Sequence, residues 1–167
     1  MASIQDVRSI NAPQKAYNWE VEIVGLSIGV DERITFHAQS TAIPEETVGT
    51  IEIPYKSRRT HHAGKDESGR TMTITFFEDE QHTVYSFFRN WLDTLISNPV
   101  TGGGVNREGY SAEVLVKTQN TDEVTVSGTF RLTNAFPSSI GEMSLDYSSS
   151  DHVTLDVTMT FDEIIFS

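Results

Sequence analysis

The motif Gly-Leu-Ser-Ile-Gly at residues 25–29 has the spacing that presents the nucleophilic serine in serine hydrolases. That serine sits on a sharp turn between a strand and a helix in a mostly parallel sheet. Here a predicted strand precedes the motif, but residues 30–33 and a second predicted strand follow it. The pattern therefore favours a glycine-flanked hairpin loop over the nucleophile of a hydrolase.

Two further motifs could bind phosphate or metal. The glycines at residues 102–104 lack the following Lys and Ser or Thr of a phosphate-binding loop. His61 and His62 are adjacent, so on a strand they point to opposite faces and cannot easily bind one metal ion. Asp66 and Glu67 could add oxygen ligands, but the segment has no recognised metal-ligand spacing. We expect neither a metal nor a cofactor.

Paired carboxylates are the remaining candidates for general acid–base catalysis. They occur at residues 31–32, 45–46 and 162–163, in predicted loops or at the ends of predicted strands. Without a cleft built from them, a solvated surface is the simpler interpretation. The sequence offers no credible catalytic residue, and we expect that the chain is not an enzyme.

Composition sets the broad class of protein. The 167 residues fit one domain and can bury a core without a covalent staple. The chain has no cysteine, which excludes disulfides and thiolate sites and fits folding in a reducing cytoplasm. Residues 1–10 lack the apolar core of a signal peptide, and no apolar run approaches the ~20 residues that span a bilayer. We expect a soluble protein.

Charge is distributed unevenly along the chain. The net charge of −12 argues against general nucleic-acid binding, which depends on basic groups that displace phosphate counterions. Residues 56–70 nevertheless hold five of the 12 basic residues, whereas residues 138–167 hold acids and no Lys or Arg. Complementary patches on different surfaces would let copies join head to tail into a ring or an open helix. Alternatively, the two segments neutralise each other within one subunit.

Alternation of apolar and polar residues predicts a mainly β protein, because successive side chains on a strand point to opposite faces. At least six strands are predicted, and Asn120-Thr121-Asp122 is the predicted hairpin turn between two of them. The last strand ends the chain as a sheet edge with one dry and one wet face. The apolar sets are Trp19, Val21, Ile23; Ile34, Phe36, Ala38; Met72, Ile74, Phe76; Val114, Val116; Val124, Val126, Phe130; and Val153, Leu155, Val157, Met159, Phe161.

One segment, residues 79–97, changes to the helical period. Its apolar residues repeat in steps of three and one, as one face of a helix does. Asp79 is the predicted N-cap, and Asn98-Pro99 is the predicted stop. We expect one amphipathic α-helix that covers an antiparallel β-sandwich or partial barrel, with a core face of Val84, Phe87, Phe88, Trp91, Leu92 and Leu95.

Three segments do not fit this scheme of strands and helix. Residues 100–110 contain the glycine run and are predicted to be an exposed mobile loop. Residues 43–70 are long for a connection in so small a domain, and such connections usually carry function or are disordered. Residues 1–16 are expected to form an N-terminal arm of the single domain 1–167.

Several short segments, in the same order, resemble the tail tube proteins of contractile-tailed bacteriophages. The C-terminal signature is Phe-Pro-Ser-Ser-Ile-Gly-Glu-Met-Ser-Leu-Asp-Tyr at residues 136–147, followed by an alternating strand. Residues 40–44 resemble the proline exit from the family's second strand, and residues 58–64 resemble its return strand. The strand at 71–77 before the helix containing Trp91 also matches. The likeness covers nearly the whole chain, from about residue 17 to residue 166.

The resemblance implies a structural role. Tail tube subunits form hexameric rings that stack into a hollow tube, and each subunit adds strands to one inner β-barrel while its helix packs outside. The implied partners are further copies of the chain, a tail sheath protein and a baseplate protein that initiates the tube, with the tape measure protein and DNA in the lumen. The implied location is the virion, after assembly in the host cytoplasm. Residues 43–70 would reach neighbouring subunits and the next ring, through Lys56, Arg58, Arg59, His61 and Lys65.

The resemblance also suggests which residues line the lumen. The expected segments are residues 34–43, part of residues 55–64 and the hairpin at 111–132. Lys117 and Arg131 lie beside Glu113 and Glu123, so these strands are nearly balanced in charge. The expected lumen-facing residues are the polar ones, Thr35, His37, Gln39, Glu113, Lys117, Glu123, Thr125, Ser127 and Thr129.

The sequence is also compatible with other classes of protein. Tube proteins of type VI secretion systems, extracellular contractile injection particles and bacteriocins resemble the same fold, as does a baseplate tube initiator. A small monomeric β-sandwich that binds carbohydrate or protein would show the same strands. Its mark would be exposed aromatic residues in loops, for which only Tyr55, Tyr110 and Tyr147 qualify.

Overall fold

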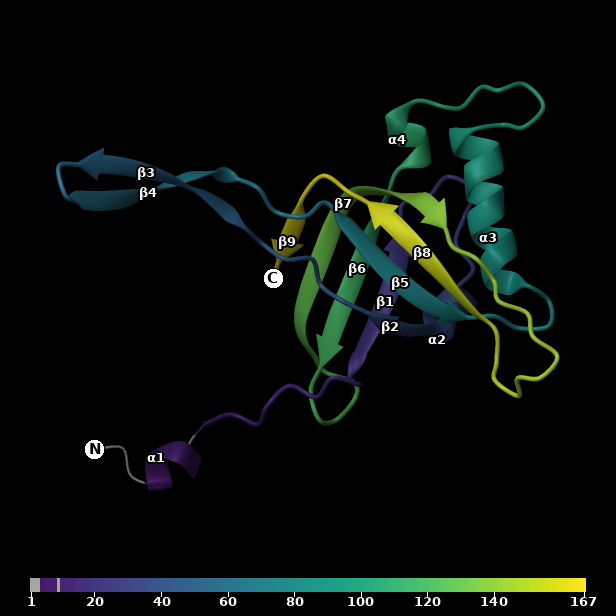
Figure 1. Ribbon diagram of the computed structural model, residues 1–167. Helices are drawn as coiled ribbons and strands as arrows, with labels where there is room; N and C mark the ends of the chain where they lie inside the picture. The colour runs from purple at the N-terminus through teal and green to yellow at the C-terminus, as the bar shows by residue number, and fades with distance from the viewer. Residues whose placement is uncertain (1–3, 9) are drawn as a thin grey trace.

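Antiparallel strands build most of the molecule, as the two-residue alternation predicts. The computed structural model describes residues 4–8 and 10–167 and contains a seven-stranded sheet and a separate two-stranded sheet (Figure 1). The larger sheet has the order β1-β6-β7-β8-β5-β2, with β9 also paired to β7. Its strands are β1 (Trp19–Val24), β2 (Ala38–Thr41), β5 (Thr71–Phe77), β6 (Ala112–Gln119), β7 (Val126–Ile140), β8 (Thr154–Thr160) and β9 (Ile164–Phe166).

Strand β7 belongs to two layers of the sheet. Its first part pairs with β6 and β9, and its last part, from Phe136 to Ile140, pairs with β8. Asn134, with φ 50°, lies between these two parts. Asn is one of the few non-glycine residues that adopt positive φ readily, and such irregularities bend a strand. The β1–β6–β7 layer and the β7–β8–β5–β2 layer therefore fold over each other.

The core lies between these two layers. Val21, Ile23, Val114, Val116 and Leu132 come from the first layer and are buried in one cluster with apolar side chains of the second. The second layer contributes Met72, Ile74, Phe76, Leu155, Val157 and Met159. These are residues of the predicted alternation, so the predicted antiparallel β-sandwich or partial barrel is confirmed.

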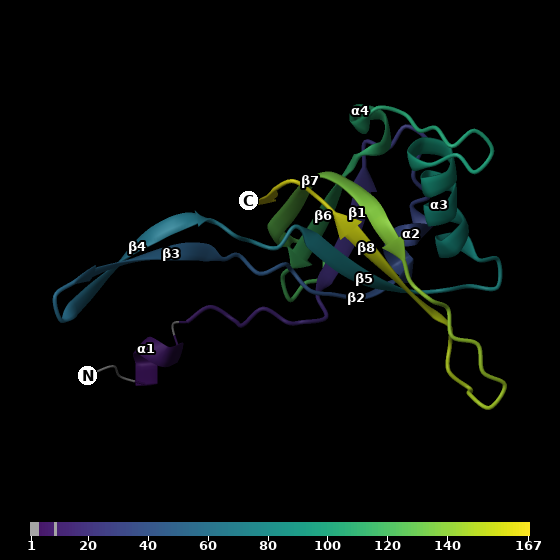
Figure 2. The ribbon, with the colours of Figure 1, turned by 45° about the horizontal axis from the view of Figure 1, so that its top comes forward.

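A helix closes one side of the two layers. Helix α3 (Thr83–Trp91) continues as a π-helical turn, η1 (Leu92–Ile96), and stands beside the sheet in Figures 1 and 2. Phe88 and Trp91 are fully buried; their rings stack at 6.2 Å, and Phe88 also contacts Phe76 at 5.4 Å. Trp91 Nε1 donates a hydrogen bond of 2.7 Å to the carbonyl oxygen of Tyr110, which satisfies the indole in the core.

Most of the expected helix face points inward. Val84, Phe88, Trp91 and Leu95 are buried, whereas Phe87 and Leu92 are only half-buried. Three further short helices are present that the periodicity does not reveal: α1 (Ile4–Arg8), α2 (Arg33–His37) and α4 (Arg107–Tyr110). Among the described residues, no helix has both the length and the apolar character needed to cross a bilayer.

The strand predicted over residues 34–38 is wrong. Residues 33–37 form α2, and β2 begins only at Ala38. Ile34 and His37 face the core because they lie one helical turn apart, whereas Phe36 is 78% exposed. A run this short is compatible with both the two-residue period of a strand and the 3.6-residue period of a helix, and here the chain forms the helix.

The strand predicted to contain Val124 also begins later than expected. Val124 is 78% exposed and lies in the turn before β7. The carboxylate of Asp122 accepts hydrogen bonds from the amides of Val124 and Thr125, and Glu123 has φ 59°. An Asx turn of this kind competes with the strand ladder and ends it.

The last long strand is not a sheet edge. The predicted alternation is confirmed, because Leu155, Val157 and Met159 are buried. However, β8 lies in the middle of its layer, between β5 and β7. One-sided alternation predicts which face of a strand is dry, and says nothing about which strands flank it.

Two segments project from this body (Figures 1 and 2). Strands β3 (Val48–Tyr55) and β4 (Arg58–Asp66) form the separate two-stranded sheet, within the long segment 43–70. The other is the N-terminal segment with α1; of the expected arm at 1–16, residues 1–3 and 9 lie outside the described residues.

We expect Trp91→Ala to lower the free energy of unfolding by about 3–5 kcal/mol, because it removes a fully buried ring. The matched control is Phe36→Ala, at a ring that is 78% exposed, which should change stability little. Urea unfolding followed by circular dichroism measures both. Equal effects of the two substitutions would contradict the placement of the core.

Candidate assembly surfaces

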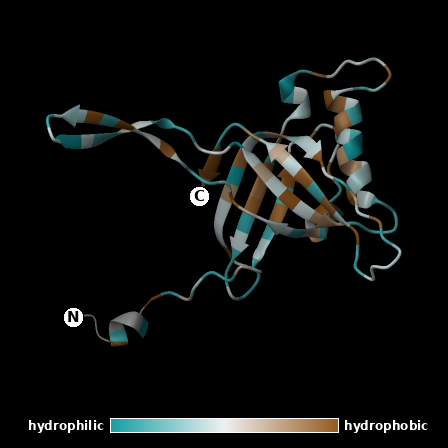
Figure 3. Ribbon diagram, viewed as in Figure 1, coloured by the Kyte–Doolittle hydropathy of each residue, from teal (hydrophilic) through white to brown (hydrophobic). Residues whose placement is uncertain are grey.

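The β3–β4 hairpin is exposed over nearly its whole length. Opposed residues share a face, and the register pairs Tyr55 with Arg58, Ile53 with Thr60 and Ile51 with His62. One face therefore carries apolar and basic groups together: Ile51, Ile53 and Tyr55 are 54%, 48% and 68% exposed. Figure 3 shows brown apolar stretches on this hairpin, far from the core.

The other face of the hairpin is polar. Glu52 pairs with His61, and Arg59 Nε lies 3.2 Å from Glu52 Oε1. Lys56 occupies the turn with φ 54°, and Lys65 is exposed near the base. The structure therefore brings the five basic residues expected at subunit contacts onto one projecting element, although on different faces of it.

The base of the hairpin is held firmly to the rest of segment 43–70. The amide of Glu67 donates to the carbonyl oxygen of Thr47 at 2.7 Å, and the amide of Gly69 donates to that of Glu45 at 3.2 Å. A side chain at Gly64 would place its Cβ 2.9 Å from the carbonyl oxygen of Gly49, so the strands approach closely there. These contacts fix the base while the tip stays exposed.

Asp66 joins this base to the start of β5. Hydrogen bonds from the hydroxyl and amide of Ser68, with the guanidinium of Arg70, hold the pKa of Asp66 below its ordinary value. Arg70 is therefore paired within its own subunit, as Arg59 is with Glu52 near the hairpin tip.

The outward side of β2, β5, β8 and the last part of β7 forms a hydroxyl face. Thr73 and Thr158 hydroxyls lie 3.1 Å apart, and the Thr75 hydroxyl donates to Asp156 at 2.7 Å. The Thr160 hydroxyl donates to that of Ser138 at 2.8 Å. The register places Thr71, Thr73, Thr75, Ser139, Asp156, Thr158 and Thr160 on this face, and the hydrogen bond from Thr160 adds Ser138. None of these residues is basic.

The outward side of β1, β6 and the first part of β7 forms a charged face. Lys117 contacts Glu22 and lies 3.9 Å from Glu20, and Arg131 lies 3.8 Å from Glu113. The hydrogen bond to Glu22 raises the pKa of Lys117. The acids and bases of this face largely neutralise each other, as the sequence predicts for Glu113, Lys117 and Arg131.

The nine residues expected in the lumen do not share one surface. Glu113, Lys117 and Thr129 lie on the charged face, on the other side of the core from the hydroxyl face. Glu123, Thr125 and Ser127 lie in or beside the turn before β7, and Gln39 is exposed on β2. Thr35 is half-buried on α2. One channel cannot be lined by all of them, because the core separates the two sheet faces.

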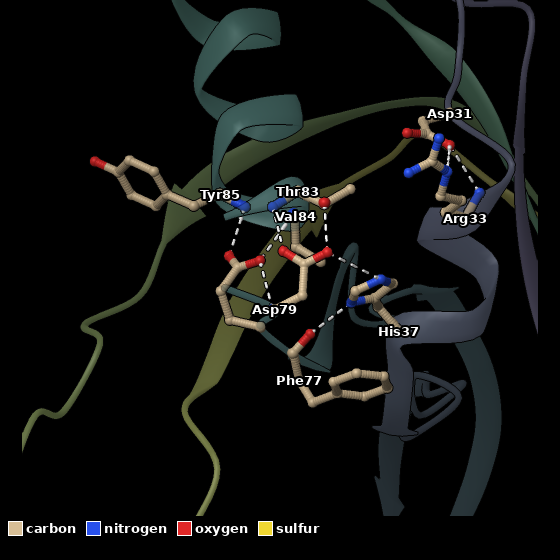
Figure 4. Close-up of polar contacts among 9 residues, drawn as sticks. Asp31, Arg33, His37, Phe77, Asp79, Thr83, Val84 and Tyr85 are labelled. Atoms are coloured by element: carbon tan, nitrogen blue, oxygen red, sulfur yellow. Dashed lines mark hydrogen bonds and ion pairs between the residues drawn. The ribbon is translucent and has the colours of Figure 1, made fainter. Parts of the chain in front are cut away.

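His37 is a buried residue, so its expected place in a lumen is wrong. Its ring is 8% exposed and stacks on Phe77 with 4.5 Å between centroids. His37 Nδ1 lies 2.9 Å from the carbonyl oxygen of Phe77, and Nε2 lies 3.9 Å from Asp79 Oδ2 (Figure 4). The histidine thus anchors α2 against the start of α3.

Two carboxylates cap the N-terminus of α3 (Figure 4). Asp79, the predicted N-cap, lies three residues before His82, which occupies the N-cap position, but its carboxylate accepts hydrogen bonds from the amide and hydroxyl of Thr83, at 2.9 and 2.6 Å. Glu78, which the sequence does not single out, accepts the amides of Val84 and Tyr85 at 3.0 and 2.8 Å. These donors are otherwise unsatisfied at a helix start, and negative charge is favourable there.

The motif with hydrolase spacing lies in a glycine-flanked turn, as the sequence pattern favours. The hydroxyl of Ser27 donates to the carbonyl oxygen of Gly109 at 3.1 Å, in a turn where Gly25 and Gly29 have positive φ. Within the described part of the chain, no three His, Cys, Asp or Glu side chains are grouped so that they could hold a metal ion.

Polar sheet faces and a projecting, exposed hairpin are the main surface features of the chain. The chain belongs to the phage tail tube protein family, whose model matches residues 7–167. It is a structural tube subunit of the class found in contractile phage tails and related contractile injection systems, and the family is not one of enzymes. The resemblance described from the short segments is therefore confirmed.

Individual relatives agree with this assignment. The chain is 28% identical to tail tube protein gp19 of Enterobacteria phage T4 over 134 residues, which are 78% of this chain and 80% of that protein. Two solved structures share the fold. The sheath–tube complex of an extracellular contractile injection system has a TM-score of 0.67 and 16% identity, covering 100% of this chain and 99% of the other. The anti-feeding prophage tube-terminating cap has a TM-score of 0.71 and 15% identity, with the same coverage.

We expect the cap on α3 to make stability depend on acid pH. The hydroxyl and amide of Thr83 lower the pKa of Asp79 below 3.8 in the folded chain, so the carboxylate contributes stability above that pH. This contribution is lost as the pH falls through the lowered pKa. Asp79→Asn should therefore be less stable than the unmodified chain at neutral pH, and this difference in stability should shrink as the pH falls through the lowered pKa of Asp79.

Urea midpoints measured from pH 7 downwards test this expectation. The matched control is Glu80→Gln, at an exposed carboxylate next to the cap, which should change the urea midpoint little at any pH. A gap between Asp79→Asn and the unmodified chain that stays constant as the pH falls would mean that the charge of Asp79 contributes nothing.

Proposed function

We propose that the chain forms hexameric rings that stack into the hollow tube of a contractile phage tail. The observation that carries this proposal is the β3–β4 hairpin, which the body of its own subunit leaves uncovered. An isolated two-stranded hairpin is only marginally stable in water and needs packing partners. Its apolar face, formed by Ile51, Ile53 and Tyr55, is accounted for if other copies of the chain cover it.

Open strand edges support ring formation. Strands β1 and β2 end the sheet and have no neighbour on their outer sides within the described residues. Open edges invite uncontrolled pairing unless they are covered or closed. Closing the sheet across six subunits into one inner barrel removes these edges. Neighbouring subunits in the ring would thus cover the outer edges of β1 and β2.

The hydroxyl face is the surface best suited to line the lumen. DNA must pass without binding, and each neutralised phosphate adds affinity. The residues of this face are hydroxyls and one carboxylate, Asp156, whereas the charged face presents Lys117 and Arg131. This placement moves the expected lumen from the β6–β7 hairpin to β5 and β8, and keeps β2.

The surrounding partners that we propose are those implied by the family resemblance. They are a sheath protein outside the tube, a baseplate protein at its initiating end, and the tape measure protein and then DNA in its lumen, in a virion assembled in the host cytoplasm. The structural similarity to injection systems makes the tube of an injection particle the second candidate. The match to the phage family model favours the phage tail.

Negative-stain electron microscopy of the purified protein at high concentration tests the assembly. We expect hollow tubes or six-fold rings of uniform diameter, in low salt more than in high salt if the hairpin charges contribute. Monomers at every concentration and salt, even after addition of tails from a related phage as templates, would contradict the proposal.

Reversing the hairpin charges should stop tube growth. We expect the triple variant Lys56→Glu, Arg58→Glu, Arg59→Glu to fold normally and to form no tubes, because like charges would meet at the contact. The matched control makes the same change of charge outside the hairpin, at the exposed residues Lys15, Arg33 and Arg89. Circular dichroism checks folding, and microscopy counts tubes. Normal tubes from the hairpin variant would refute electrostatic stacking.

Positive charge in the lumen should slow the passage of DNA. We expect Thr73→Lys with Thr158→Lys, on the hydroxyl face, to leave tubes intact and to slow genome ejection several-fold, because DNA phosphates bind the added ammonium groups. Ejection is followed by the fluorescence of a DNA dye after receptor addition. The matched control is Thr129→Lys on the charged face, and slower ejection by this control alone would place that face in the lumen instead.

A further inference from the structure

The loop between β7 and β8 carries an exposed groove. Residues 141–153 have no regular structure, and Leu145 and Tyr147 are 80% and 112% exposed. With neighbouring residues they line a hollow of about 800 Å³. Large apolar side chains displayed at the rim of a hollow are a common mark of an interaction site.

Hydrogen bonds give this groove a defined shape. The carboxylate of Asp146 accepts hydrogen bonds from the amide and hydroxyl of Ser148, at 2.9 and 2.8 Å. Gln39 Nε2 lies 2.9 Å from His152 Nε2, which ties β2 to the loop. The ring of His152 contacts Phe77 edge-on with 6.3 Å between centroids. The groove therefore rests on the end of the sheet.

The charge of the groove is acidic. Asp146 and Asp151 line it, and no Lys or Arg occurs anywhere in residues 138–167. Hydrogen bonds from Ser148 lower the pKa of Asp146, so this carboxylate is ionised at any pH near neutrality. A partner that fits the groove must combine apolar side chains with positive charge.

The tip of the β3–β4 hairpin has this combination. Ile53 and Tyr55 lie on one of its faces, Arg58 is paired with Tyr55 on the same face, and Lys56 occupies the turn. Lys56 Nζ lies 5.4 Å from the centre of the Tyr55 ring, so the basic and aromatic groups form one unit.

The two features lie at opposite ends of the molecule. In Figures 1 and 2 the hairpin leaves the body on the left, and the β7–β8 loop extends at the lower right. Strands β3 and β4, of 8 and 9 residues, extend about 26 and about 30 Å at ~3.3 Å per residue. A hairpin tip therefore cannot reach the groove of its own subunit. A contact between different surfaces of two copies repeats head to tail.

We propose that the tip of the β3–β4 hairpin of one copy docks in the groove of residues 144–154 of a second copy, with Tyr55 beside Leu145 and Tyr147, and with Lys56 and Arg58 facing Asp146 and Asp151. The proposal rests on the proposed function, because it assigns the surface that receives the hairpin when subunits assemble.

Cross-linking between introduced cysteines tests this contact, since the chain has no cysteine of its own. Protein carrying Tyr55→Cys is mixed with protein carrying Tyr147→Cys, assembled, and treated with a short bismaleimide. We expect a cross-linked dimer at a yield several-fold above that of a control mixture. The control replaces Tyr147→Cys with Val100→Cys, at a residue that is 90% exposed on another loop.

Electron microscopy of the same mixtures distinguishes failure of the docking site from failure of the proposed function. Rings or tubes without a cross-link above the control would overturn the docking site and leave the proposed function standing. A complete absence of assemblies from the unmodified chain, with tails of a related phage added as templates, would overturn both. A charge swap gives a second measurement: Asp146→Lys with Asp151→Lys should abolish tubes, and adding Lys56→Asp with Arg58→Asp to the same chain should restore them. Failure of this restoration, with both proteins folded, would also count against the docking site.

Discussion

Backbone pairing along β7 is the constraint on which the rest of the structure depends. This strand donates and accepts hydrogen bonds with β6, β9 and β8, and it changes partner near Asn134. The bend allows one strand to belong to both layers, so that the apolar sides of β6 and β8 meet in a single core. Without this bend in β7, the hydroxyl face and the charged face would not point in opposite directions. The separation of a hydroxyl face from a charged face is therefore a consequence of how this one strand bends.

The helical side of the molecule depends on a second set of contacts. Glu78 and Asp79 satisfy the first amides of α3, and His37 brings α2 against the same place. The rings of Phe88 and Trp91 then close the core between the layers. Helix α3 packs against one side of the two layers. It therefore leaves both outward faces, the hydroxyl face and the charged face, free for contacts outside the subunit.

The sequence predicts faces of strands better than it predicts their neighbours. Alternation identifies the buried residues of β1, β5, β6 and β8, because burial alone produces that pattern. It cannot reveal that β8 lies between β5 and β7, because strand order depends on backbone pairing that leaves no trace in side-chain type. The error at Ile34 and Phe36 has another cause, since a run so short fits two periods. The lumen set fails for a related reason: polar residues such as Glu113 and Gln39 are alike in sequence, yet the core lies between their faces.

The position of β8 bears on how the chain is made. β5 can complete its layer only when β8 has been synthesised, and β1 waits for β6, to which Trp19 is joined through Thr118. Contacts between segments so distant along the chain form slowly, whereas β3 and β4 are adjacent and need only a tight turn. On the ribosome the two strands of the hairpin therefore emerge and pair first, but the hairpin alone is only marginally stable. The growing chain lacks a finished sheet until β8 and β9 have emerged, so synthesis itself delays the moment at which one subunit can receive another.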